Sequence, residues 1–431
     1  MADRVGHVRL DSLMCGVLLG FVVWQVWRQQ RRRLRRWWQT TAERLPQQWH
    51  PASEQACAQC RDGVHVTFVR TARNVPPYAG CKSRRGAKKR LSSEGYACPC
   101  RACVYFGNTH AAEHALVGYG KQGADQHQRW RCQACGTTFS GRRGTLLYYL
   151  KSEPSQVELV LWFLAEGVDI SVLVRYTGRR EATLTRWLER SGQQSARWHT
   201  LLFAGLSLAL VQMDELCVRM RGVAHRRWLW LAIDPLSKAL PALHLGGRRA
   251  EDAQALVHEL KDRLAPDCIP AFTTDGLRVY FSALTAHFGR WVKPPEARPA
   301  HWQVEEHLLY GQLVKRRERR HVVFTTMRMR WGKRHDWTQV LQRHGLSACI
   351  QTAFIERLTL TLRQSVSLLT RKTWSLPLSD AQLLQHVRWW RHYYHFLRPH
   401  QALRQCTPAM ALGLTDHVWS IHEFVTTPLI L

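Results

Sequence analysis

The sequence predicts a mixed α/β domain that is preceded by a small cysteine-rich ribbon and a helical segment. Three observations lead to this fold class: cysteine pairs at metal-ligand spacing, apolar residues at helical spacing after them, and short apolar runs that alternate with a helix further along. At roughly 150 residues per domain, the 431 residues provide for two or three domains. We expect the ribbon at residues 96–150, the helices at 151–200 and the α/β domain at 201–375.

The composition indicates a polyanionic partner. The 62 Lys and Arg residues outnumber the 32 Asp and Glu residues, so the formal charge is +30. The hydrophobic fraction of 45% and the charged fraction of 22% are ordinary for a globular protein, which excludes a disordered chain and a collagen-like fibre. Because self-repulsion opposes compaction of a chain with this charge, we expect nucleic acid as its partner.

The first 55 residues are predicted to be an apolar and basic segment. The run Ser12–Trp27 is almost wholly apolar and precedes a cluster of arginines. Its 16 residues fall short of the ~20 that span a bilayer comfortably. Three readings stay open: a weak membrane tether that leaves the following chain in the cytoplasm, a buried or oligomerising helix, and a misassigned start codon. Residues 56–95 are predicted to be a basic linker.

Cysteine spacing predicts a zinc site and a reducing cytoplasm. Nine of the 13 cysteines fall in the first 135 residues, and several form pairs with two residues between them. Within residues 96–140, two thiolate pairs about thirty residues apart can close a tetrahedral shell around one Zn²⁺ at the tips of two short hairpins. Cys132 and Cys135 supply one pair, whereas three thiols compete for the other two positions: Cys98, Cys100 and Cys103.

Residues 151–200 are predicted to form a helix-turn-helix. Apolar residues recur at helical spacing in 157–164 and again in 170–174, with Gly167 between the two helices. The helix Glu181–Arg190 follows a turn and would be the recognition helix, with Leu184, Trp187 and Leu188 facing inward. An ordinary helical connector is the alternative. The residues expected to reach DNA are Arg179, Arg180, Thr183, Arg186 and Arg190.

Short apolar runs between Leu206 and Leu245 predict three neighbouring strands. A helix is expected over Arg249–Leu264, and a fourth strand follows and ends at Asp275. Strands followed by a helix and a further strand are typical of a mixed α/β sheet.

Carboxylates at the ends of these strands predict a divalent-metal site. Asp214 and Asp275 each end an apolar strand in a chain that is poor in acid. Two aspartates on neighbouring strands repel each other unless a cation neutralises them, and Glu356 can complete the set. Two Mg²⁺ (or Mn²⁺) ions held about 3.5–4 Å apart by these side chains would support phosphoryl transfer on nucleic acid. Asp234 also ends a strand but precedes a proline, and we expect it to be a turn residue.

The segment around Glu356 is predicted to be helical. Phe354, Leu358 and Leu362 are expected to face the core. Arg357 and Arg363 are further candidates for DNA contact. Structural alternatives exist for the acidic residues taken singly, since Asp275 could be a turn residue and Glu356 half of a helical salt bridge.

Several stretches resemble the DDE transposases of bacterial insertion sequences, specifically those with an N-terminal zinc ribbon and helix-turn-helix. They are QMDELCVRMR, LWLAIDPLSK, TTDGLRVYFSALTAHFG, QTAFIERLTLTLRQSVSLLTRKTW, RHYYHFLRPHQALR and TPAMALGLTDHVW, and the likeness runs from about Lys82 to Trp419. One departure is the very short stretch between RPHQALR and TPAM, where a longer basic insertion is expected.

The resemblance implies an RNase H-like catalytic domain at 201–375, followed by a helical C-terminal segment at 376–431. It implies Asp214, Asp275 and Glu356 as the catalytic and Mg²⁺-binding residues. The ribbon cysteines implied by the family are Cys98, Cys103, Cys132 and Cys135, which leaves Cys100 as the extra thiol.

The implied function is an enzyme that binds the ends of its own insertion sequence and cleaves and joins DNA with Mg²⁺. Its partners would be double-stranded DNA, as element ends and as target, and further copies of itself in a homo-oligomer on that DNA. It would act in the bacterial cytoplasm with the nucleoid. The alternatives are a DNA-binding regulator with an inactive catalytic domain and a hydrolytic DNA nuclease.

Aromatic and basic residues alternate in a stretch near the C-terminus. Packing of this helix against the catalytic sheet is the first interpretation, and stacking on unpaired bases at a cleaved end is the second. The aromatic residues are Trp389, Trp390, Tyr393, Tyr394 and Phe396.

Overall fold

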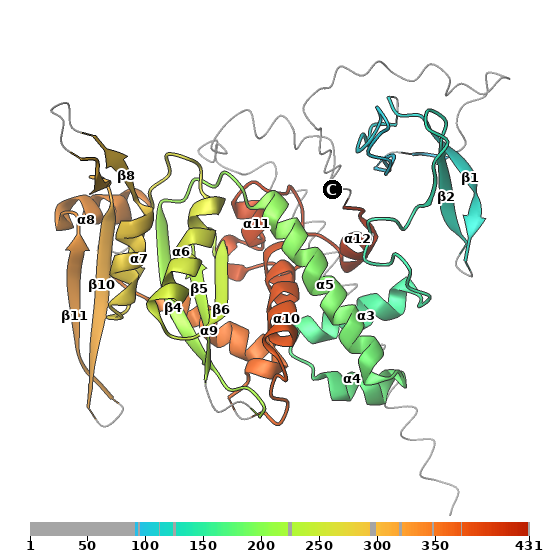
Figure 1. Ribbon diagram of the computed structural model, residues 1–431. Helices are drawn as coiled ribbons and strands as arrows, with labels where there is room; N and C mark the ends of the chain where they lie inside the picture. Colours follow the sequence, from blue (N-terminus) through green and yellow to red (C-terminus); the bar gives the residue numbers. More distant parts are fainter. Residues whose placement is uncertain are drawn as a thin grey trace, which may run out of the picture. The chain divides into compact units, whose positions relative to one another are not determined.

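The computed structural model (Figure 1) describes residues 91–429 except 94, 112, 124–125, 223–225, 294–298, 319–320, 347–348 and 372. All of them belong to one compact unit, Cys60–Leu431. The predicted N-terminal segment with its apolar run Ser12–Trp27, and nearly all of the predicted basic linker, lie outside the described residues. Among the described residues, no helix has the length and apolar character that crossing a membrane requires.

A small antiparallel sheet occupies the cysteine-rich region. Its strands are β1 (Leu116–Gln122), β2 (His127–Cys132) and β3 (Thr138–Ser140), with β2 in the middle. Its core consists of a few side chains around Trp130 and includes three cysteines. So small a core supplies little hydrophobic stabilisation. A metal ion bound by the cysteines, as the spacing predicts, would add to the stability of this sheet.

Three helices follow this sheet, as the apolar spacing predicts. They are α3 (Pro154–Ala165), α4 (Ile170–Thr177) and α5 (Glu181–Leu202). Proline occupies the first turn of α3, the Asp169 side chain caps α4, and Gly178 ends α4 in the left-handed conformation. The third helix runs to Leu202, beyond the predicted end at Arg190. Its second half is buried mainly through small and polar residues such as Ser191, Gly192 and Ser195, and Trp198 is the large apolar side chain buried with them.

A mixed sheet of six strands forms the centre of the following region, in the order β11-β10-β7-β4-β5-β6. The three predicted neighbouring strands are β4 (Leu210–Val218), β5 (Arg227–Ile233) and β6 (Ala242–Gly246), and they pair antiparallel. The predicted fourth strand is β7 (Ala271–Thr274), which is parallel to β4 on one side and to β10 (Leu309–Glu318) on the other. The edge strand β11 (His321–Trp331) pairs antiparallel with β10.

Helices cover both faces of this sheet (Figure 1). The side chains of β5 alternate between them: Leu229, Leu231 and Ile233 pack with α9 (Ala353–Ser365) and α10 (Asp380–His392). Trp230 and Ala232 pack with α6 (Ala250–Arg263) and α7 (Val279–His287). The predicted helix over Arg249–Leu264 is thus confirmed.

The remaining elements are short and lie around the sheet. The hairpin β8 (Gly289–Val292) and β9 (His301–Val304) precedes β10, and α8 (Arg334–Arg343) follows β11. After α9 comes the 3-10 turn η2 (Ser367–Leu369). The C-terminal segment continues from α10 through η3 (Tyr393–Leu397), η4 (Gln401–Leu403), α11 (Pro408–Ala411) and α12 (Ile421–Thr426).

The aromatic residues near the C-terminus are buried, as the packing interpretation predicts. At most 5% of the surface of each of the five rings is exposed, so they do not offer their faces to DNA bases. The Trp389 Nε1 donates to the Leu161 carbonyl at 2.9 Å, which ties α10 to α3. The stretch therefore serves the core.

Candidate functional site: an acidic opening in the sheet

A short central strand leaves an opening in the sheet. Thr274, the last residue of β7, pairs with Met213 of β4 and with Gln312 of β10. Both neighbours run on, to Val218 and Glu318, so no strand separates them beyond this point. A cavity of about 500 Å³ lies here, and it is lined by Asp214, Asp275, Glu356, Arg248 and Lys315 among others.

Backbone hydrogen bonds orient the two predicted aspartates. Asp214 Oδ1 accepts from the Glu215 N–H at 2.9 Å, and Asp275 Oδ1 accepts from the Leu277 N–H at 2.9 Å. Oxygen atoms of Asp214, Glu215 and Asp275 lie within 4.8 Å of one another. Burial, and then the charges of Glu215 and Asp275, raise the pKa of Asp214 to about 7. A cation between these carboxylates would remove that repulsion and favour the ionised forms.

Glu215 is a member of this cluster that the sequence interpretation missed. Its neighbour Asp214 lies on the side of the sheet that faces α9, and strand alternation places Glu215 on the opposite side. The opening beyond β7 nevertheless lets the two carboxylates approach each other. Arg248 donates to Glu215 Oε1 from Nε at 3.1 Å and from Nη2 at 2.6 Å, and the Tyr280 hydroxyl donates to Oε2 at 3.2 Å. The only signal in the sequence was a second acid directly after Asp214.

Glu356 lies at the rim of the opening, in the first turn of α9. It forms an ion pair with Lys315 of β10 and accepts from the Thr352 hydroxyl at 2.5 Å. It lines the same cavity as the two aspartates but is not part of the group of carboxylates within 4.8 Å of one another. The predicted third carboxylate is therefore near the other two, with a lysine as its present partner.

The predicted inward face of α9 needs a correction. Leu358 and Leu362 are buried as expected, but the third core residue is Ile355 and not Phe354. Phe354 is partly exposed, and the Lys238 ammonium lies 3.9 Å from the centre of its ring. Only the first of the three predicted positions differs: Ile355 packs toward β4, where its N–H donates to the Gln212 side chain at 3.1 Å.

Asp234 has the role of a turn residue that its following proline indicates. Its carboxylate accepts from the N–H groups of Leu236 and Ser237, each at 3.0 Å, and from the Ser237 hydroxyl at 2.5 Å. These bonds account for a buried carboxylate outside the acidic cluster.

Four cysteines gather at one end of the small sheet. The Sγ atoms of Cys98, Cys103, Cys132 and Cys135 lie within 4.8 Å of one another, and Cys100 is not part of this group. Cys132 ends β2 and Cys135 lies in the turn to β3, as expected for a knuckle. Cys98 and Cys103 lie outside the three strands, so the second predicted hairpin is absent from this described part of the chain. Burial raises the pKa of the Cys98 thiol and that of Cys103, the latter to about 11.

The candidate DNA-contacting arginines differ in what they contact. Arg179, Arg180 and Arg186 are exposed around the start of α5, and Thr183 is partly exposed. Arg190 instead donates from Nη2 to the carbonyls of Leu146 and Tyr148, at 2.9 and 2.6 Å. One nitrogen of the Arg190 guanidinium is thus used within the protein, and its predicted DNA contact stays a prediction. On α9, Arg357 is exposed, whereas Arg363 is partly buried and donates to two carbonyls.

Comparison with protein families finds a known domain in the part of the chain that begins just before α9 and extends beyond α10. The family model of the integrase core domain matches residues 347–408, which include Glu356, Arg357 and Arg363. No curated protein matches the chain. The family match supports a catalytic domain of the integrase and transposase type, for which DNA is the substrate.

Proposed function

We propose that the protein is a DDE transposase of an insertion sequence, which binds the ends of its element and cleaves and joins DNA in the presence of Mg²⁺. The observation that carries this proposal is the cluster of Asp214, Glu215 and Asp275 in the opening beyond β7, with Glu356 at its rim. Carboxylates this close together, one of them buried and two of them partly buried, oppose one another's ionisation unless a cation is present. In a chain with 62 Lys and Arg residues against 32 Asp and Glu residues, a cluster of carboxylates that lacks, among the described residues, a basic partner for each of them favours a bound cation.

The donor set fits divalent cations. Carboxylate oxygens are the ligands that Mg²⁺ and Mn²⁺ prefer, and Asp214, Asp275 and Glu356 would hold two such ions. The ions would supply Lewis acidity and an activated water or 3′-hydroxyl at a phosphodiester. The protein's own contribution is to fix the ligands: backbone N–H groups orient Asp214 and Asp275, and Arg248 with Tyr280 holds Glu215.

The cysteine cluster is proposed to bind one Zn²⁺ through Cys98, Cys103, Cys132 and Cys135. Four thiolates form the usual shell of a structural zinc, and the small hydrophobic core of this sheet includes three of these residues. Zinc would offset the cost of ionising the buried thiols, whose pKa burial raises.

The helices α3, α4 and α5 are proposed to read the element ends as a helix-turn-helix. The start of α5 would enter the major groove with Arg186 and Thr183 toward the bases, while Arg179 and Arg180 contact phosphates. The exposure of the three arginines supports this arrangement. Assembly of several copies on the DNA, and action in the bacterial cytoplasm, remain part of the proposal.

The test is nicking of a duplex that carries the DNA flanking the gene, with Mg²⁺. Asp214→Asn, Asp275→Asn and Glu356→Gln should each abolish nicking, because loss of one ligand disorganises the metal site. DNA binding should persist, since removing an acid reduces repulsion of phosphates. The matched control is Asp234→Asn, which removes an equivalent charge from a turn and should remain active.

The outcomes separate the alternatives. Nicking without joining of the cut strand to a target would identify a hydrolytic nuclease. Binding of the flanking DNA by wild-type protein without nicking in Mg²⁺ or Mn²⁺ would identify a regulator. Full activity of Glu356→Gln together with loss of activity in Glu215→Gln would assign the third carboxylate to Glu215 instead.

A further inference from the structure

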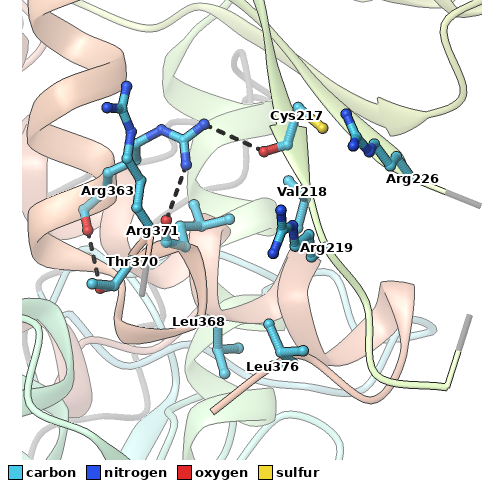
Figure 2. A pocket seen from close by; sticks show the side chains of 10 residues that line it. Cys217, Val218, Arg219, Arg226, Arg363, Leu368, Thr370, Arg371 and Leu376 are labelled. Atoms are coloured by element: carbon cyan, nitrogen blue, oxygen red, sulfur yellow. Dashed lines mark hydrogen bonds between the residues drawn. The ribbon is translucent and has the colours of Figure 1, made fainter. Parts of the chain in front are cut away.

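A second cavity lies beside α9, the helix that also carries Glu356 (Figure 2). Its lining residues differ from those of the acidic opening. Its volume is about 290 Å³, and four arginines from four places in the chain line it. Arg219 follows β4, Arg226 precedes β5, Arg363 belongs to α9, and Arg371 follows η2. Among the described residues that line the cavity there is no carboxylate. Guanidinium groups brought together without acidic partners favour an anion between them.

Arg363 connects two of the segments that line this cavity. Its guanidinium donates to the Leu369 carbonyl at 3.3 Å and to the Cys217 carbonyl at 3.4 Å, which holds the turn after α9 against β4. The Thr370 hydroxyl donates back to the Arg363 carbonyl at 3.2 Å. Burial, and then the neighbouring charge of Arg371, lower the pKa of Arg363. Arg219, Arg226 and Arg371 are exposed, so their guanidinium groups can reach an incoming anion.

An exposed tryptophan lies three residues after Arg371 along the chain. The Trp374 side chain is 100% exposed, and its carbonyl accepts from the N–H of Leu376, a residue that lines the cavity. Sites for single-stranded nucleic acid typically combine two features. Basic side chains contact the phosphates of the strand, and an aromatic ring stacks on one of its bases. Neither feature alone would distinguish a nucleotide from another anion.

The position of the cavity relates it to the acidic opening. Glu356 and Arg363 lie seven residues apart on α9, and at about 1.5 Å per residue this separation is roughly 10 Å along one side of the helix. The β4 strand also runs from Asp214 at the opening to Val218 at the cavity. A DNA strand held at the carboxylates can therefore reach the cavity within a few nucleotides, each of which advances about 3.4 Å in a duplex.

We propose that this arginine cavity binds a backbone phosphate of an unpaired DNA nucleotide whose base stacks on Trp374, a few nucleotides from the phosphodiester at the acidic opening. This proposal rests on the proposed function. It adds a site for single-stranded DNA next to the proposed cleavage site. Such single-stranded DNA would form where the end of the duplex is opened.

The test measures the affinity of the full-length protein for a fluorescent single strand of about 12 nucleotides and for a duplex of the same sequence. This length is about the site size of proteins that bind single strands. Trp374→Ala should weaken single-strand binding about fivefold to a hundredfold and leave duplex affinity within about twofold. Arg371→Gln and Arg219→Gln should each weaken single-strand binding and lower its log–log salt slope by about 0.7. The matched controls are Trp291→Ala and Arg290→Gln in the β8 hairpin, where Trp291 is 69% exposed; both should bind as wild type.

A probe with abasic positions completes the test. The wild type should bind it more weakly than the intact strand, whereas Trp374→Ala should bind both equally. Equal losses of single-strand and duplex affinity in Trp374→Ala, or a loss no larger than that of Trp291→Ala, would overturn the proposal. The binding assays contain no divalent cation and report affinity whether or not the protein nicks DNA, so a failure of nicking and a failure of this site are recognised separately.

Discussion

At the scale of single residues, the two aspartates combine charge with a fixed orientation. Each uses Oδ1 to accept a backbone N–H, from Glu215 in one case and from Leu277 in the other. An asparagine can keep that bond through its own carbonyl oxygen while it loses the charge. Substitutions of Asp by Asn at these positions therefore remove negative charge with little effect on the local backbone, which makes them the informative variants for the proposed metal site.

The cysteine cluster gives a prediction with a built-in control. Cys98→Ser should lower the zinc content from about one equivalent and unfold the small sheet, because a structural zinc provides much of the folding free energy of such a module. Cys100→Ser should retain both, since the Cys100 sulfur is not part of the group within 4.8 Å. Metal analysis and circular dichroism of the full-length protein measure the two effects. Loss of zinc in Cys100→Ser alone would exchange the two assignments.

His417 predicts a dependence of stability on pH. Hydrogen bonding to Glu423, and then to Asp416, outweighs burial and raises the pKa of His417 to about 9. The stabilising contribution is therefore fully present below the unfolded pKa of about 6.5, and it is lost as the pH rises through about 9. Urea unfolding of wild type and of His417→Gln between pH 6 and pH 10 measures it. The difference between the two should shrink toward alkaline pH, and a constant difference would contradict the assignment.

Sequence patterns located the aspartates but not their surroundings. Asp214 and Asp275 could be found because each ends an apolar run, a property of the local sequence. Glu215 could not be assigned, because strand alternation places it on the other side of the sheet and only the short length of β7 brings it back. The partners of Arg190 and Arg363 are carbonyl groups, and no side-chain pattern encodes a carbonyl acceptor.

At the scale of elements, the contact between α5 and α10 depends on a small residue. A Cβ atom at Gly192 would lie 2.4 Å from the Gln385 carbonyl oxygen and 2.7 Å from its Cα. Because these are backbone atoms, the two helices would have to move apart to accept a side chain. The glycine thus has a packing role despite its low helix propensity.

Gly192→Ala should consequently destabilise the protein by about 1–3 kcal/mol, although alanine is the better helix former. Thermal or urea unfolding measures the change. The control is Gln193→Ala at the neighbouring exposed position, which should change the free energy of unfolding by less than about 0.5 kcal/mol. A stabilised Gly192→Ala protein would mean that the helices are farther apart than described.

Elements with regular apolar spacing were predicted well and others were not. The strands β4 to β7 and the helix α6 follow local apolar runs, and their positions agree with the predicted ones. The end of α5 was misplaced because its second half is buried mainly through small and polar residues, with Trp198 as the large apolar side chain among them. The long β10 and β11 strands carry many charged or exposed side chains, so neither strand has the clear alternation of a half-buried strand.

At the scale of the whole molecule, the net charge of +30 has a direct consequence for DNA binding. Basic side chains release counterions when they contact phosphates, so affinity falls with salt. We expect duplex affinity to fall about 10³- to 10⁵-fold between 50 and 200 mM salt, the range for six to ten phosphate contacts. Titrations across this range measure the slope, and an affinity independent of salt would show that the excess charge serves another purpose.

The short length of β7 sets where the acidic opening lies. Two more residues of pairing would fill the gap between β4 and β10 with backbone, and the carboxylates would then be separated by a continuous sheet. An insertion after Thr274 should therefore inactivate the enzyme even with every acidic residue retained. A related chain that keeps every acidic residue can thus lose the opening through the length of one strand, and a search for inactive relatives has to compare the spacing before Asp275 as well as the acids themselves.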